Sequence, residues 1–132
     1  MKHVDIAGLG PGGKQCITQE VKETIENAEI IIGSKRLTES YSDAGRKVFC
    51  AVTADAIMDI IKNEDAQKFV VLMSGDTGFY SGTKKLVSRL ISDNYSYRIM
   101  PGISSVVYLA SKIGQPWEAA ALVSLHGKKQ SY

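Results

Sequence analysis

The sequence predicts an α/β fold, a mostly parallel open sheet of about five strands with helices on both faces. Short apolar runs alternate with segments of helical periodicity, as expected for parallel strands joined by helical crossovers. The run 69–73 is continuously apolar, which is typical of a central strand buried on both faces. Glycine-rich turns follow two of the apolar runs, a placement common in sheets that bind a ligand at one edge.

The first half of the chain has the pattern of strand, helix, strand, short helix and strand. Each strand is a short apolar run, and the long helix carries apolar residues three or four positions apart. In chain order these segments are 4–9, 19–28, 29–32, 34–41 and 47–51. Thr18 is a typical N-cap for the first helix, and Glu20 suits the positive end of its dipole. Gly33 ends the second strand.

The second half continues the alternation. In chain order we expect a helix after Thr53, a strand over 69–73, a helix around 86–91, a strand over 97–100, a helix ending at Gly114 and a strand over 121–125. The buried stripe of the helix after Thr53 is expected to comprise Ala56, Ile57, Ile60 and Ile61. Ser104 or Ser105 caps the last helix, and Gly114 terminates it.

Composition narrows the class of protein. The chain has 132 residues, 44% of them hydrophobic and 23% charged, which suits one globular domain. The net charge is only +2 and no basic stripe is present, so nucleic acid is not an expected partner. Cys16 and Cys50 stand outside any metal-binding pattern, so no metal site is expected. No apolar run reaches the roughly 20 residues that span a bilayer, so we expect a cytoplasmic protein without a membrane partner.

Two glycine-rich turns indicate where a ligand binds. Residues 8–13 (Gly-Leu-Gly-Pro-Gly-Gly) follow the first strand, and residues 74–78 (Ser-Gly-Asp-Thr-Gly) follow the central strand. Glycine permits sharp turns and close approach to a ligand, and turns at the carboxyl ends of parallel strands line one crevice. The role of Asp76 stays open, because Asp in a turn commonly hydrogen-bonds its own backbone. The pattern indicates a domain that binds a small polar molecule.

A dinucleotide is one candidate for that molecule. Gly8, Gly10 and Gly13 match the pattern GxGxxG between a strand and a helix. The pattern also expects an acidic residue at the end of the second strand, where this chain has Lys35 and Arg36. These cations would suit the 2′-phosphate of NADP, so an NADP-binding oxidoreductase domain is an alternative. Pro11, however, has no amide to offer a phosphate, which favours a ligand without one.

Five segments together resemble the tetrapyrrole methylases, a family that uses S-adenosylmethionine as methyl donor. They are 8–12 (GLGPG), 32–36 (IGSKR), 74–81 (SGDTGFYS), 101–105 (PGISS) and 123–127 (VSLHG). With Pro116-Trp117, they look most like the corrin-pathway C5-methyltransferases, which act on precorrin-6Y or cobalt-precorrin-7 in cobalamin biosynthesis. The resemblance therefore implies methyl transfer to C5 of a small-molecule tetrapyrrole. Family members often carry Pro where this chain has Thr77.

The resemblance also implies which residues bind the methyl donor. The matching positions are Pro11, Ser74, Gly75, Asp76, Phe79, Ser104, Ser105 and Leu125. Some of these have a second role open: Pro11 stiffens a turn, Ser104 and Ser105 suit helix caps, and Leu125 suits a core. No catalytic acid or base is implied, because direct methyl transfer depends mainly on the alignment of donor and acceptor.

The resemblance further implies a protein of two domains. Residues 1–127 correspond to the N-terminal methylase domain, and 128–132 to the start of a linker to a C-terminal domain absent from this chain. In the family the donor lies in the cleft between the two domains, so this part alone is expected to be inactive. A non-catalytic half-domain is thus a further interpretation, and a homodimer is an arrangement that the family allows.

Overall fold

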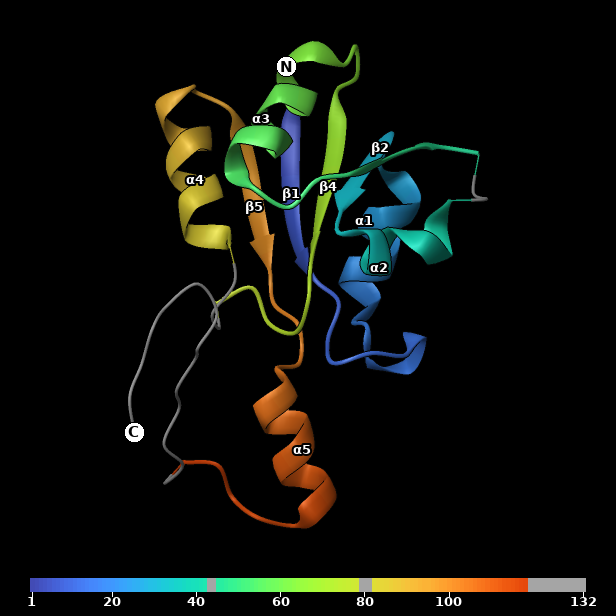
Figure 1. The fold of residues 1–132 in the computed structure, drawn as a ribbon, viewed down its shortest axis with the longest axis vertical. Coiled ribbons are helices and arrows are strands. Elements are labelled where there is room, and N and C mark those ends of the chain that lie inside the picture. The colour runs from blue at the N-terminus through green and yellow to red at the C-terminus, as the bar shows by residue number, and fades with distance from the viewer. Residues whose placement is uncertain (43–44, 79–81, 119–132) are drawn as a thin grey trace.

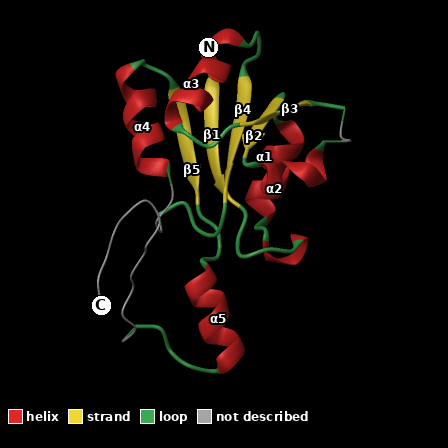
Figure 2. Cartoon of the chain, in the orientation of Figure 1, coloured by secondary structure: helices red, strands yellow, loops and turns green. Residues whose placement is uncertain are grey.

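A computed structural model describes residues 1–42, 45–78 and 82–118. Within them one sheet has helices on both faces (Figures 1 and 2), which confirms the predicted α/β class. The strands are β1 His3–Gly8, β2 Ile30–Gly33, β3 Lys47–Cys50, β4 Lys68–Met73 and β5 Ser96–Met100. The helices are α1 Gln19–Asn27, α2 Lys35–Thr38, α3 Ala54–Asn63, α4 Thr83–Ser92 and α5 Ser105–Ile113, with 3₁₀ turns at Lys14–Cys16 and Glu39–Tyr41. None of the described helices is long and apolar enough to cross a membrane.

The strand order is β3-β2-β4-β1-β5, and every neighbouring pair is parallel. The continuously apolar β4 occupies the centre, and its residues 69–72 are buried. The chain leaves β1 for α1 on one face, whereas it leaves β4 for α4 on the other. The direction of winding therefore switches between the carboxyl ends of β1 and β4, the place where open α/β sheets bind ligands.

Two apolar layers hold the helices on the sheet. One face packs Ile57, Met58 and Ile61 of α3 and Leu86 and Leu90 of α4 against the strands. On the other face the buried residues of α1 pack against the sheet. Each fully buried side chain of this size contributes roughly 1.5–3 kcal/mol to stability.

The buried stripe of α3 differs from the expected one at three positions. Met58 is fully buried, whereas Ala56 and Ile60 are only partly buried. The prediction for Ile57 and Ile61 is confirmed. The stripe is turned toward α4, which packs beside α3, and a hydrophobic period alone does not reveal that neighbour.

Helix ends follow the predicted caps. Thr18, Thr53 and Ser104 each accept a hydrogen bond from the amide three residues ahead, at 3.2 Å. Ser104 rather than Ser105 is therefore the cap of α5. Gly114 ends that helix with φ 70° and ψ 28°, the left-handed conformation that glycine adopts without strain.

Helix α5 does not pack on the sheet. Figure 1 shows it beyond the carboxyl ends of the strands, apart from the two layers. Of its residues only Ala110 is buried, while Leu109 and Ile113 are 60% and 61% exposed. The described part of the chain thus offers the apolar side chains of α5 little to pack against. The predicted strand over 121–125 lies outside the described residues.

Three loops meet backbone to backbone where β1, β4 and β5 end. Gly10 and Gly75 form an antiparallel bridge, in which the amide of each donates to the carbonyl of the other at 3.1 and 2.9 Å. A Cβ on Gly102 would stand 2.4 Å from the carbonyl oxygen of Gly75, and a Cβ on Gly8 would stand 2.7 Å from the nitrogen of Gly102. Only hydrogen fits at these positions, so glycine sets the spacing of the loops.

Lys2 ties the start of the chain to the end of α3. Its ammonium donates to the carbonyl oxygens of Ile61 at 2.6 Å, Lys62 at 3.3 Å and Glu64 at 2.9 Å. It also lies 5.7 Å from the centre of the Phe69 ring. The last carbonyls of a helix lack intrahelical partners and carry partial negative charge, so a cation there is stabilising.

Replacing this cation tests its contribution. We expect Lys2→Met to lower the free energy of unfolding by about 1–2 kcal/mol, because the carbonyls at the end of α3 lose a charged donor. Lys84→Met is the matched control, since Lys84 is exposed and has no polar partner among the described residues; its change should stay within about 0.5 kcal/mol. Urea denaturation measures the free energy of unfolding of both variants. Equal losses of stability in the two would contradict the role of Lys2 at the end of α3.

Glycine replacement tests the contact of the three loops. We expect Gly102→Ala to lower the free energy of unfolding by at least about 2 kcal/mol, because the new methyl group meets backbone on two sides. Gly82→Ala is the control, since no described atom lies within 4 Å of its Cβ position and its φ is −75°. That control should be neutral or stabilising by up to about 1 kcal/mol. A stable Gly102→Ala protein would show that the loops can separate at little cost.

Candidate functional site

A hollow of about 470 Å³ opens at the carboxyl edge of the sheet, beside Gly102. Its walls come from the loop after β4, the loop after β5, the start of α5 and Trp117. The volume is in the range of small-molecule sites, and most of the exposed wall is apolar, with a few polar groups at one side. Position, size and lining make this hollow the candidate binding site.

Asp76 links two of the loops that form the wall. Its Oδ2 accepts a hydrogen bond from the Gly78 amide at 3.0 Å, the local contact that is common for Asp in turns. Its Oδ1 accepts from the Gly102 amide at 3.1 Å, in the loop after β5. Nearby, the buried Thr77 hydroxyl donates to the Met100 carbonyl at 3.5 Å. The β4 and β5 loops are thus held together by side chain as well as by backbone.

The two serines at the start of α5 have different positions. Ser104 is buried, lines the hollow and uses its Oγ to accept from the Val107 amide. Ser105 is exposed and does not contribute to the wall. Of this pair, the structure brings only Ser104 together with Asp76.

The first glycine loop lies at the same edge of the sheet but outside the wall of the hollow. Pro11 stands at its tip, between Gly10 and Gly12, both of which have positive φ. Gly75 contacts this loop through its bridge to Gly10. Ser74 is exposed and accepts a hydrogen bond from Arg36 Nη2 at 3.2 Å. Phe79 and Leu125, the remaining expected donor-binding residues, lie outside the described residues.

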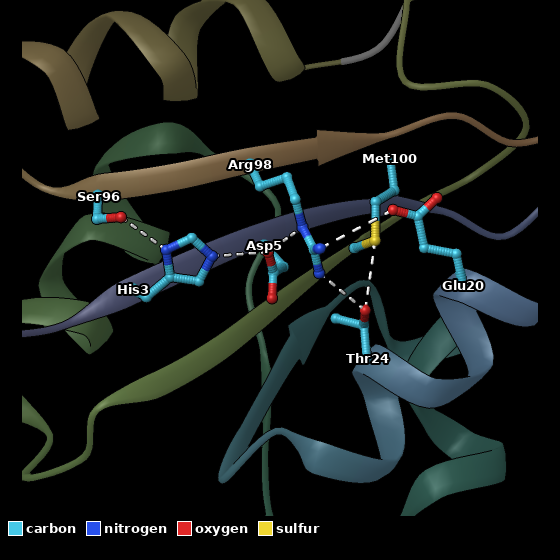
Figure 3. A network of polar contacts seen from close by, with 7 residues as sticks. All are labelled: His3, Asp5, Glu20, Thr24, Ser96, Arg98 and Met100. Carbon is cyan, nitrogen blue, oxygen red and sulfur yellow. Dashed lines mark hydrogen bonds and ion pairs between the residues drawn. The ribbon is translucent and has the colours of Figure 1, made fainter.

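A second hollow, of about 460 Å³, lies at the opposite end of β1. Figure 3 shows the polar network that borders it. Asp5 Oδ1 lies 2.8 Å from His3 Nε2 and accepts from Arg98 Nε at 3.1 Å. Arg98 also donates to Thr24 Oγ1 at 3.2 Å, and His3 Nδ1 lies 2.7 Å from Ser96 Oγ. Since these groups satisfy one another, we assign the network a structural role that joins β1, β5 and α1.

The candidate site therefore has the chemistry of a binding cleft. Its carboxylate, Asp76, is engaged by two amides, and its serine, Ser104, caps a helix. Among the described residues, no group of three or more His, Cys, Asp or Glu side chains is placed to hold a metal ion. What the site offers a ligand is a shaped, largely apolar wall beside rigid backbone.

Comparison with known proteins identifies the family of the chain. Residues 3–132 match the family model of the tetrapyrrole (corrin/porphyrin) methylases. A protein of Methanocaldococcus jannaschii named "Probable cobalt-precorrin-7 C(5)-methyltransferase" is 32% identical, over 96% of this chain and 61% of its own length. The cobalt-precorrin-7 C(5)-methyltransferase of Salmonella typhimurium is 31% identical, over 96% of this chain and 63% of its own length.

Solved structures share the fold. The precorrin-6Y methylase of Archaeoglobus fulgidus has a TM-score of 0.69 and 26% identity, covering 86% of this chain and 59% of that one. The uroporphyrin-III C-methyl transferase of Thermus thermophilus, complexed with S-adenyl homocysteine, has a TM-score of 0.68 and 19% identity. The match covers 92% of this chain and 52% of that one. The chain spans between half and two thirds of the length of these relatives. The chain belongs to the tetrapyrrole (corrin/porphyrin) methylases.

Proposed function

We propose that this domain binds S-adenosylmethionine at the switch point of the sheet and takes part in methyl transfer to C5 of a corrin precursor in cobalamin biosynthesis. The observation that carries the proposal is the contact of three glycine loops beside the hollow. Relatives that are named C(5)-methyltransferases support the position of methylation. The proposed donor-binding residues are those expected from the sequence, with Asp76 and Ser104 at the wall.

The backbone at this edge suits a donor without phosphate groups. The amides of Gly10 and Gly75 already donate to each other's carbonyl oxygens, and the Gly102 amide donates to the carboxylate of Asp76. Pro11 has no amide. A diphosphate needs several free amides at such a turn, as in dinucleotide-binding loops. The arrangement therefore supports the methylase interpretation over an NADP-binding oxidoreductase.

The wall of the hollow also suits methyl transfer. When bound, S-adenosylmethionine supplies an electrophilic methyl group on a sulfonium centre, which loses its positive charge as the methyl group leaves. Val106 and Val107 contribute apolar side chains to the wall, and apolar surroundings favour a step in which charge is lost. The rigid glycine loops would hold the donor in line with the acceptor carbon, and alignment supplies most of the acceleration. This step needs no general acid or base from the protein.

We further propose that a second domain completes the cleft. The chain spans 61% and 63% of the length of two curated relatives, and Leu109, Ile113 and Trp117 are exposed on the α5 side of the hollow. Residues 1–127 would form the N-terminal methylase domain, and 128–132 would begin the linker. A second domain would bury these apolar side chains, as would a homodimer that packs at α5. The cytoplasmic location stays a prediction from the sequence.

Calorimetric titration with S-adenosylhomocysteine, run in parallel with NADPH, tests the proposed donor. We expect binding of S-adenosylhomocysteine alone, because the amides of Gly10, Gly75 and Gly102 are already engaged and Pro11 has no amide to offer a phosphate. Binding of NADPH alone would contradict the proposal and favour the oxidoreductase alternative. Binding of neither would show that this domain lacks contacts on which donor binding depends.

Removing the link between the loops should weaken donor binding. We expect Asp76→Ala to raise the dissociation constant of S-adenosylhomocysteine about tenfold, because two amides lose a charged acceptor and the β4 and β5 loops lose one of their links. Asp76→Asn keeps one acceptor oxygen, so its dissociation constant should lie between those of the native chain and the Asp76→Ala protein. Asp59→Ala, an exposed position on α3, is the control. Unchanged affinity of the Asp76→Ala protein would show that the link is not needed for binding.

A further inference from the structure

Arg36 differs from the other three arginines of the chain. Arg46 donates to the carbonyl oxygen of Ile25, while Arg89 and Arg98 form ion pairs with aspartates. Arg36 makes no ion pair with any described residue, and its hydrogen bond there is the one from Nη2 to Ser74 Oγ. A guanidinium has five N–H donors, so most of its hydrogen-bonding capacity is left to solvent or to a ligand.

The fold places this guanidinium at the ligand edge. Arg36 is the second residue of α2, which directly follows β2, and β2 is the neighbour of β4 in the sheet. Ser74 is the first residue after β4 and precedes Gly75, which bridges to Gly10. The hydrogen bond between Arg36 and Ser74 therefore holds a positive charge beside the glycine loops, on the β2 side of the edge.

Among the described residues, no carboxylate forms an ion pair with the guanidinium at this edge. Asp76 is the carboxylate of the wall, and two backbone amides already occupy its oxygens. Arg36 is exposed, and its planar fork matches two oxygens of one carboxylate. Lys35, its neighbour on α2, is also exposed but has no described partner that fixes its side chain. Arg36 is thus an exposed cation that one hydrogen bond holds at the ligand edge, with most of its N–H donors unused by described residues.

We propose that Arg36 binds a side-chain carboxylate of the methyl acceptor. This inference rests on the proposed function, since a corrin precursor carries acetate and propionate groups around its ring. Arg36 would then help to determine which methyl acceptor binds. It lies on the β2 side of the edge, separate from the donor-binding glycines. The 2′-phosphate of a nucleotide is also an anion that a guanidinium binds. The experiment must therefore distinguish a corrin carboxylate from a nucleotide phosphate as the partner of Arg36.

The probe is dicyanocobyrinic acid, a corrin with free carboxylates, and its fully methylated ester is the uncharged counterpart. We expect Arg36→Met to weaken binding of the acid about five- to tenfold, as for a partly exposed charge-assisted pair. Binding of the ester should stay within about twofold, because it presents no free carboxylate, whereas an equal loss of S-adenosylhomocysteine binding would instead assign Arg36 to the amino-acid carboxylate of the donor. Arg36→Lys should restore part of the affinity, and Lys35→Met is the matched control, with a change below about twofold. Circular dichroism confirms that each variant is folded.

The outcomes separate this inference from the proposed function. Unaltered affinity of the Arg36→Met protein for the acid, or no binding of the acid by the native chain, would overturn the role of Arg36 while S-adenosylhomocysteine binding stands. Equal losses of affinity for the acid in the Arg36→Met and Lys35→Met proteins would overturn this role as well, since they would indicate general electrostatic attraction to the positive charge of α2. Loss of NADPH binding in the Arg36→Met protein would identify the anion as a nucleotide phosphate. Failure of the native chain to bind S-adenosylhomocysteine would instead reject the proposed donor site.

Discussion

Close backbone contact among Gly8, Gly75 and Gly102 governs the ligand edge of this domain. The register of the sheet brings these residues together, because Gly8 pairs with Met73 and Ala7 pairs with Met100. Each loop then leaves its strand at the same level, and a single methyl group between them would overlap with backbone. The loops can therefore adopt one spacing, which the carboxylate of Asp76 reinforces. A preformed site of this kind needs little ordering when a ligand binds.

The amino end of the sheet contributes mainly to stability, whereas the carboxyl end presents groups to a ligand. At the amino end, the network of His3, Asp5 and Arg98 pairs its own polar groups, and Lys2 caps α3. At the carboxyl end, a largely apolar wall and the guanidinium of Arg36 face outward. A ligand that enters the carboxyl end thus meets apolar side chains and a guanidinium with unused N–H donors, beside the polar groups that link the loops. This division is common in open parallel sheets, where strands position the loops that bind.

The features that follow from local chemistry were predictable. Thr18 and Thr53 cap helices because their hydroxyls reach amides three residues ahead, and the glycine turns meet because parallel strands end at one edge. The pair of Asp5 and Arg98, 93 residues apart, follows from the neighbouring positions of β1 and β5, which no local pattern reveals. Likewise, the sequence predicts the helix α5 but not that Leu109 and Ile113 are exposed, because burial depends on what lies beside the helix. The roles of individual donor-binding residues stay predictions.

The most direct test of the account is to map the amide chemical shifts of the labelled chain during titration with S-adenosylhomocysteine. If the donor binds beside the glycine loops, the largest changes fall on the loops around Gly12, Gly78 and Gly102 and on the first turn of α5, all at the carboxyl edge of the sheet. The amides of β1 and β5 near His3 and Arg98 should change little, since their network lies at the opposite end. Changes centred on that network, with none at the glycine loops, would contradict the assignment of the site.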